Sequence, residues 1–313
     1  MTLSWRSYRD CPPSLQALAW PHLPSPPPHE AAPGPRRLLL PHHGTTSLDR
    51  YPMSSRYFTN ATGWGEPLIY PSLSFVPGYA NIDILDCCNG LLLCHNRTVA
   101  GAVCYVVCNP ATEQWAAPAL PDSVQAGNIF TARLVFDPAL SPHFHVFEFV
   151  ETDPDPEGGY VFVDGLEIYS SKTGEWIYRD SRWSDEATLC FDHDLSTVFL
   201  SGFLHVFAAE RQDVLAVDIE GNTWRTIAVP HGNDDGFIGQ SQGRLYYLNM
   251  LQEHDFKVTV FVLEDYSSGE WVFKHSVMAS ELFGMSSFDP IQYYRVIAFH
   301  LECHLVYLIC FGF

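Results

Sequence analysis

The stretch that decides the fold is residues 86–115, Asp-Cys-Cys-Asn-Gly-Leu-Leu-Leu-Cys-His-Asn-Arg-Thr-Val-Ala-Gly-Ala-Val-Cys-Tyr-Val-Val-Cys-Asn-Pro-Ala-Thr-Glu-Gln-Trp. It contains two apolar runs, residues 91–94 and 104–108, followed by a turn at Asn109 and Pro110. Both runs are apolar at consecutive positions, so each predicts a strand that is covered on both faces. The stretch therefore indicates a hairpin of two buried strands that leads into a third strand at Trp115.

The same pattern of glycine, two apolar strands, a turn and a tryptophan returns further along the chain. It begins again at Gly202 and at Gly243, and residues 166–176 keep its second half. The tryptophans that close the four copies lie 61, 48 and 47 residues apart: Trp115, Trp176, Trp224 and Trp271. A period of about fifty residues predicts a repeat architecture.

Tight turns separate the paired strands within each copy. Gly174, Gly221 and Gly269 occupy positions where we expect a positive φ, which glycine adopts more readily than a residue with a Cβ atom. In the first copy we expect Pro110 to fix φ for a type I turn and Asn109 to cap that turn. The residues that mark the repeat are Asn89, Gly90, Asn109, Pro110, Trp115, Gly174, Trp176, Gly202, Gly221, Trp224, Gly243, Gly269 and Trp271.

Strands grouped at this period, with few helical segments, predict an all-β fold of the kelch-like β-propeller type, built from repeated four-stranded antiparallel blades. A β-sandwich is the alternative, but it would give alternating strands without the recurrent pattern. Residues 295–299 and 305–311 predict two strands of another blade whose closing strand is absent. The ring must therefore borrow strands from residues 38–76 or remain incomplete.

Local patterns outside the repeats predict further elements. We expect strands over residues 38–40, 67–70, 72–77, 128–137, 144–150 and 195–200. We expect short helical turns over residues 14–20, 184–189 and 277–283.

Composition excludes several classes of protein. Apolar residues make up 47% of the chain and aromatic residues 14%, so the chain as a whole is not disordered. The net charge of −19 repels a phosphate backbone and argues against nucleic-acid binding. We also expect no membrane partner, because no apolar run approaches the roughly 18 residues of a membrane span. The nine cysteines suit reduced thiols, which predicts an intracellular location, cytoplasmic or nuclear.

The chain shows no pattern typical of a catalytic, cofactor or metal site. It has no Cys-x-x-Cys pair, and Cys104 and Cys108 would lie about 13 Å apart along a strand, too far to share one ion. We interpret residues 192–194, Asp-His-Asp, as a polar turn, and His42-His43 as solvated. No nucleophile motif or phosphate loop is present. We therefore expect neither an enzyme nor a cofactor.

Residues 85–94 and 105–115 closely resemble the associated domain of plant F-box proteins, a large family of kelch-like propellers. Residues 72–77 and 11–18 are similar to the lead-in of that family. The resemblance implies three segments. These are residues 1–10, a remnant of the last F-box helix, residues 11–64, a proline-rich and largely irregular arm, and residues 65–313, the propeller domain.

The family resemblance implies a protein-interaction module that recognises a protein substrate for an SCF-type ubiquitin ligase. In such proteins the F-box binds a Skp-type adaptor and the propeller holds the target. Here only Trp5 and Arg6 resemble an adaptor-binding remnant, so a Skp-type adaptor and a cullin ligase are expected partners only where an F-box is present. The alternatives are a stand-alone scaffold or decoy, and a propeller hydrolase with carboxylates facing each other in its axial channel.

Overall fold

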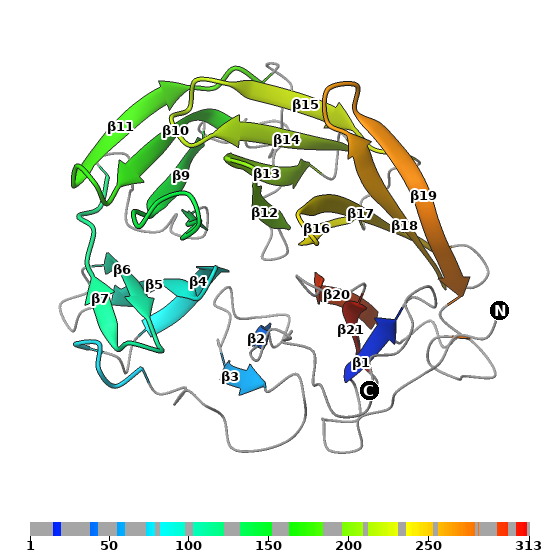
Figure 1. Cartoon of the computed structure of the whole chain (residues 1–313). Helices are drawn as coiled ribbons and strands as arrows, with labels where there is room; N and C mark the ends of the chain where they lie inside the picture. The colour runs from blue at the N-terminus through cyan, green and yellow to red at the C-terminus, as the bar shows by residue number, and fades with distance from the viewer. Residues whose placement is uncertain are drawn as a thin grey trace, which may run out of the picture.

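A computed structural model describes most of the repeat region and parts of the N-terminal segment. The described residues are 15–19, 38–42, 55–59, 73–78, 82–97, 103–121, 132–151, 163–183, 196–208, 212–230, 236–252, 256–278, 281, 293–299 and 305–311. Their strands form small sheets arranged in a ring around a central axis (Figure 1). No helix in these ranges is long and apolar enough to span a membrane.

Four of the sheets are four-stranded and antiparallel, and we number them blades 1 to 4 in chain order. Blade 1 consists of β4 (Ile82–Cys88), β5 (Leu91–Arg97), β6 (Val103–Asn109) and β7 (Gln114–Ala116). Blade 2 consists of β8 (Arg133–Val135), β9 (His145–Glu151), β10 (Val163–Ser170) and β11 (Glu175–Asp180). Blade 3 consists of β12 (Thr197–Leu200), β13 (Phe203–Ala208), β14 (Asp213–Asp218) and β15 (Trp224–Ala228). Blade 4 consists of β16 (Phe237–Ser241), β17 (Arg244–Gln252), β18 (Phe256–Asp265) and β19 (Glu270–Met278).

Within each blade the strands follow one another from the inside of the ring to the outside. In Figure 1, β4, β12 and β16 lie nearest the centre, whereas β7, β11, β15 and β19 form the outer rim. This arrangement confirms the predicted all-β fold of repeated four-stranded blades. It also confirms the strands expected within residues 128–137, 144–150 and 195–200.

Two smaller sheets occupy the rest of the ring. One contains β20 (Tyr293–Phe299), β21 (Leu305–Phe311) and β1 (Leu15–Ala19), and the other pairs β2 (Leu38–His42) with β3 (Ser55–Thr59). The prediction that β21 lacks a closing strand is wrong, because β1 pairs with it from Leu15↔Ile309 to Ala19↔Leu305. One added strand comes from residues 15–19, and residues 38–42 and 55–59, within the predicted range 38–76, supply the other small sheet of the ring. Neither sheet reaches four strands in the described ranges, so the propeller is incomplete there.

Two local predictions are wrong, and a third is wrong for its first two residues. The helical turn over residues 14–20 is the strand β1, because the edge of β21 offers its backbone groups partners that a single helical turn cannot match. Residues 73–78 form a turn and not a strand, in which Leu73 has φ 48° and accepts a hydrogen bond from Val76 N at 2.9 Å. Of the helical turn expected over residues 277–283, Val277 and Met278 instead extend β19, whereas Glu281 is helical.

The strand predicted over residues 38–40 is confirmed as part of β2. The elements expected over residues 67–70 and 184–189 lie outside the described residues.

Neighbouring blades pack face to face through apolar clusters that both contribute to. Leu204 and Val206 of β13 join the cluster shared with blade 2, whereas Phe207 of the same strand joins the cluster shared with blade 4. In β14, Leu215 joins the cluster shared with blade 2, and Val214 joins the cluster shared with blade 4. A middle strand therefore has two buried faces, which explains its consecutive apolar residues.

The repeat tryptophans lie on the outer strands and do not form the core. Trp115 is 46% exposed, and the other three are partly buried. Two of them connect neighbouring blades. The indole N–H of Trp176 donates to Ala119 O at 2.7 Å, and that of Trp271 donates to Ala228 O at 2.9 Å. Trp115 is thus less buried than the other three repeat tryptophans.

Candidate interaction site between blades 3 and 4

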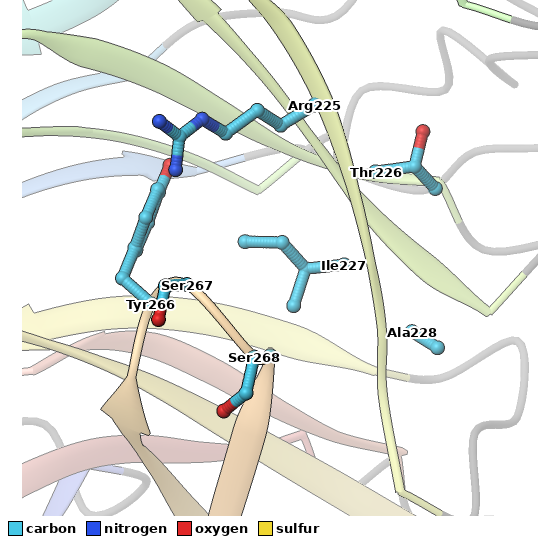
Figure 2. Close-up of a pocket in the computed structure, with 8 residues that line it drawn as sticks. Arg225, Thr226, Ile227, Ala228, Tyr266, Ser267 and Ser268 are labelled. Atoms are coloured by element: carbon cyan, nitrogen blue, oxygen red, sulfur yellow. The ribbon is translucent and has the colours of Figure 1, made fainter.

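A hollow of about 440 Å³ opens where the outer strand of blade 3 faces a turn of blade 4. It is lined by residues 225–228 of β15 and residues 266–269, which connect β18 to β19. Figure 2 shows the side chain of Arg225 extending toward the ring of Tyr266, with Ile227 lying between β15 and the turn. In Figure 1, β15 and β19, which flank the residues that line the hollow, lie at the outer rim of the ring.

The turn that forms one wall is held by its own side chains. The carboxylate of Asp265 accepts hydrogen bonds from Ser267 N at 2.8 Å, Ser267 Oγ at 2.6 Å and Ser268 Oγ at 2.9 Å. These donors lower the pKa of Asp265 to about 2. Gly269 has φ 69°, and a Cβ atom there would lie 3.4 Å from Ile227. The turn therefore packs closely over β15.

Behind this wall, Tyr266 is fixed to the interior by His205 of β13. His205 is fully buried, with its Nδ1 3.1 Å from Val198 O and its Nε2 2.7 Å from the Tyr266 hydroxyl. Because a carbonyl oxygen only accepts hydrogen bonds, Nδ1 carries the proton and Nε2 accepts from Tyr266. Burial lowers the pKa of His205 to about 4, so the ring is neutral at pH 7.

Lowering the pH from 6.5 to 4 is expected to cost the fold about 3 kcal/mol through His205. The histidine pKa is 6.5 before the shift and about 4 in the fold. Between these values the unfolded chain binds a proton that the folded chain does not, so the free energy of unfolding falls as the pH falls, by about 3 kcal/mol in total. Urea unfolding at several pH values measures this. His205→Gln, which cannot bind the proton, should show a shallower pH dependence, and equal slopes for the two proteins would contradict the assignment.

Arg225 lies over two aromatic faces at the mouth of the hollow. Its guanidinium carbon is 5.1 Å from the centroid of the Phe203 ring and 5.0 Å from that of Tyr266. In such cation–π contacts the cation is attracted to the face of the aromatic ring. No carboxylate among the residues that the structure describes forms an ion pair with Arg225. In contrast, Arg244 and Lys274 both pair with Glu264.

This junction departs from the repeat. The residue after each repeat tryptophan is apolar in blades 1, 2 and 4 and cationic in blade 3: Ala116, Ile177, Val272 and Arg225. A second difference lies three residues after the glycine that opens each repeat, Gly90, Gly202 or Gly243. This position is Leu93 in blade 1 and Tyr246 in blade 4, but His205 in blade 3. Sequence reasoning did not single out His205, Arg225 or Tyr266. An alignment of the repeat copies would have identified His205 and Arg225 as polar residues at positions that are apolar in the other blades.

The repeat markers lie in turns and outer strands, and of these residues only Gly269 lines the hollow. The glycines predicted to have positive φ do so, at 77° for Gly174, 68° for Gly221 and 69° for Gly269. Positive φ is also found at Asn89, Gly90, Gly202 and Gly243. Trp224 donates its indole N–H to Gly221 O at 2.9 Å.

The predicted cap of the first turn is confirmed. Asn109 Oδ1 accepts from Ala111 N at 2.9 Å and from Thr112 N at 3.3 Å, in the turn that contains Pro110. Trp5, Arg6 and residues 192–194 lie outside the described residues. Across the described ranges, no group of three His, Cys, Asp or Glu side chains is placed to hold a metal ion.

A second polar cluster is buried between blades 1 and 2. The hydroxyl of Tyr105 donates to Glu148, and Arg133, only 7% exposed, interacts with the charges of both Glu148 and Asp86. Asp86 accepts hydrogen bonds from Leu134 N at 2.8 Å and Cys87 N at 2.7 Å. Burial lowers the pKa of Arg133, and the two carboxylates oppose that shift. Both carboxylates thus serve as counter-charges of a buried cation.

Comparison with known proteins identifies relatives of the repeat region. A family described as F-box protein At3g26010-like, beta-propeller, matches residues 64–310. F-box protein At5g07610 of Arabidopsis thaliana is 28% identical over 225 residues, which are 66% of this chain and 50% of that protein. F-box protein At5g49610 of the same plant is 24% identical over 222 residues, which are 64% of this chain and 56% of that protein. The chain spans about half the length of these curated relatives.

Among solved structures, an α-L-arabinofuranosidase from Clostridium thermocellum is similar with a TM-score of 0.35 and 11% identity, covering 69% of this chain and 78% of that one. A likeness at this level carries no argument about function.

Proposed function

The chain belongs to the F-box protein At3g26010-like β-propeller family, and on this basis we propose that it is a protein-interaction module that holds a target protein for an SCF-type ubiquitin ligase. The observation that supports this most directly is the hollow at the rim between blades 3 and 4. Arg225 lines it, at the position after the repeat tryptophan where the other blades have an apolar residue. Among the described residues, no carboxylate forms an ion pair with Arg225. Arginine and tyrosine are residue types that commonly anchor protein interfaces.

A binding role also agrees with how the polar residues of the ring are used. Asp86 and Glu148 are engaged by Arg133, Tyr105 and backbone N–H groups, and Glu264 is engaged by Arg244 and Lys274. Carboxylates held in this way are unsuited to act as a general acid and base. We therefore propose a function without catalysis and without a cofactor, in preference to the hydrolase alternative.

A cytoplasmic or nuclear location accompanies this proposal. It is supported by the cysteines of blade 1, which are free thiols although several lie close together on paired strands: Cys87, Cys88, Cys94, Cys104 and Cys108. Reduced thiols of this kind are typical of intracellular compartments.

Adaptor capture tests the ligase proposal. The chain would be tagged in plant cells, alone and fused behind the F-box segment of F-box protein At5g07610, and probed for a Skp-type adaptor and a cullin. We expect the fusion to recover the adaptor together with a target whose abundance rises when cullin activation is blocked. The F-box segment alone is the control and should recover the adaptor without the target. A target that is captured but never ubiquitinated in the fusion would contradict the ligase role and favour a stand-alone scaffold.

A further inference from the structure

We propose that the hollow between β15 and the turn at residues 266–269 receives the carboxylate of an aspartate or glutamate side chain from the protein partner, with Arg225 as its counter-charge. The inference rests on the proposed function, because it names the chemistry of the partner at that site.

Arg225 is held in a way that leaves its hydrogen-bonding groups available. The guanidinium carbon lies 5.1 and 5.0 Å from the ring centroids of Phe203 and Tyr266, and the guanidinium N–H groups donate to no acceptor within the described residues. The edge that can donate two parallel hydrogen bonds to a carboxylate therefore remains open. No carboxylate of the described ranges neutralises Arg225, although the chain has 36 acidic and 17 basic residues.

Tyr266 makes this arrangement rigid. Its hydroxyl donates to the buried, neutral Nε2 of His205 at 2.7 Å, and its ring stands edge-on to the His205 ring with centroids 5.6 Å apart. The tyrosine ring against which Arg225 lies is therefore anchored in the interior of blade 3. A side chain fixed before binding loses less conformational freedom when the ligand arrives, which favours affinity.

The remaining walls favour a carboxylate over a phosphate. The hydroxyls of Ser267 and Ser268 already donate to Asp265, so they cannot also donate to a phosphate. The negative charge of Asp265 in the same turn disfavours a dianion, and phosphate sites generally use several arginines. Ile227, on the same face of β15 as Arg225, supplies an apolar surface against which the methylene groups of an aspartate or glutamate can pack.

The experiment is an NMR titration of the purified chain with N-acetyl-glutamate methylamide, following the Nε–Hε resonance of Arg225. We expect that resonance to shift with saturation, and the neutral isostere N-acetyl-glutamine methylamide to leave it in place. Arg225→Gln should weaken binding, read from neighbouring backbone amides, by about tenfold or more, as expected for loss of a charge-assisted pair. The matched control Arg244→Gln, whose guanidinium is occupied by Glu264, should bind as the unmodified chain does.

Three results would overturn the proposal: no shift at Arg225, an equal response to the glutamine probe, or a stronger response to phosphoserine than to glutamate. A thermal melt of Arg225→Gln that matches the unmodified chain shows that the variant is folded. Tyr266→Phe keeps the ring but removes its bond to His205, so it should weaken binding less than Arg225→Gln. The titration contains no ligase component, so its failure can be told apart from failure of adaptor capture.

Discussion

Replacing Arg133 with methionine is expected to destabilise the fold by about 3–5 kcal/mol, the usual cost of removing one partner from a buried ionic cluster. Methionine fills similar space, so the loss comes from charge and not from a cavity. Asp86 and Glu148 would keep their negative charges between blades 1 and 2 without the cation that offsets them. Urea unfolding, followed by tryptophan fluorescence, gives the free energy of unfolding for the variant and the unmodified chain.

The pH dependence of this loss identifies its cause. Burial raises the pKa of Asp86, and Arg133 lowers it, so removing Arg133 should raise that pKa further. Protonation at lower pH then removes part of the unpaired charge, and the penalty should be smaller in mildly acidic solution than at neutral pH. Arg182→Met, at an exposed position just after blade 2, is the matched control and should change stability by no more than about 0.5 kcal/mol. Equal penalties at every pH would show that packing, not charge, is responsible.

Tyr247→Ala is expected to destabilise the fold by about 3–5 kcal/mol through a cavity between blades 3 and 4. Tyr247 is fully buried on β17, with its ring centroid 5.6 Å from that of Phe207 in blade 3 and 5.9 Å from that of Trp271 on β19. The residue therefore joins the two blades that enclose the hollow. The expected result is a lower urea midpoint together with a changed environment of Trp271.

Phe273→Ala is the matched control for this prediction. Phe273 lies on β19 in the same blade and, like Tyr247, contacts Phe261, but its side chain is 57% exposed. Truncation there leaves no enclosed cavity, so the expected loss is within about 0.5 kcal/mol. A loss at Phe273 equal to that at Tyr247 would contradict the account of the core as a set of interfaces between blades.

The sequence was sufficient to predict the blades because their signals are local. Gly174 and Gly269 mark turns, and the consecutive apolar residues of β13 and β14 reflect two buried faces. Pairings between distant segments left no such local signal. Residues 15–19 resemble a helical turn when taken alone, and only the open edge of β21 makes them a strand.

The candidate site was missed for a related reason. His205, Arg225 and Tyr266 come from β13, β15 and the turn after β18, so no single stretch of sequence contains their arrangement. Each is an ordinary residue in its own segment. Their relation becomes visible only when the blades are superimposed as repeats and the position after each tryptophan is compared.

The pairing of β1 with β21 has a consequence for how the protein is synthesised. Blades 1 to 4 are built from strands that follow one another, so each can assemble on the ribosome soon after its own residues emerge. In contrast, β1 pairs with β21, from Leu15↔Ile309 to Ala19↔Leu305, so β1 has no partner strand until β21 has been synthesised. An unpaired strand of a nascent chain is open to capture by chaperones or by other polypeptides. The strand at residues 15–19 can therefore pair only after residues 305–309 have been synthesised.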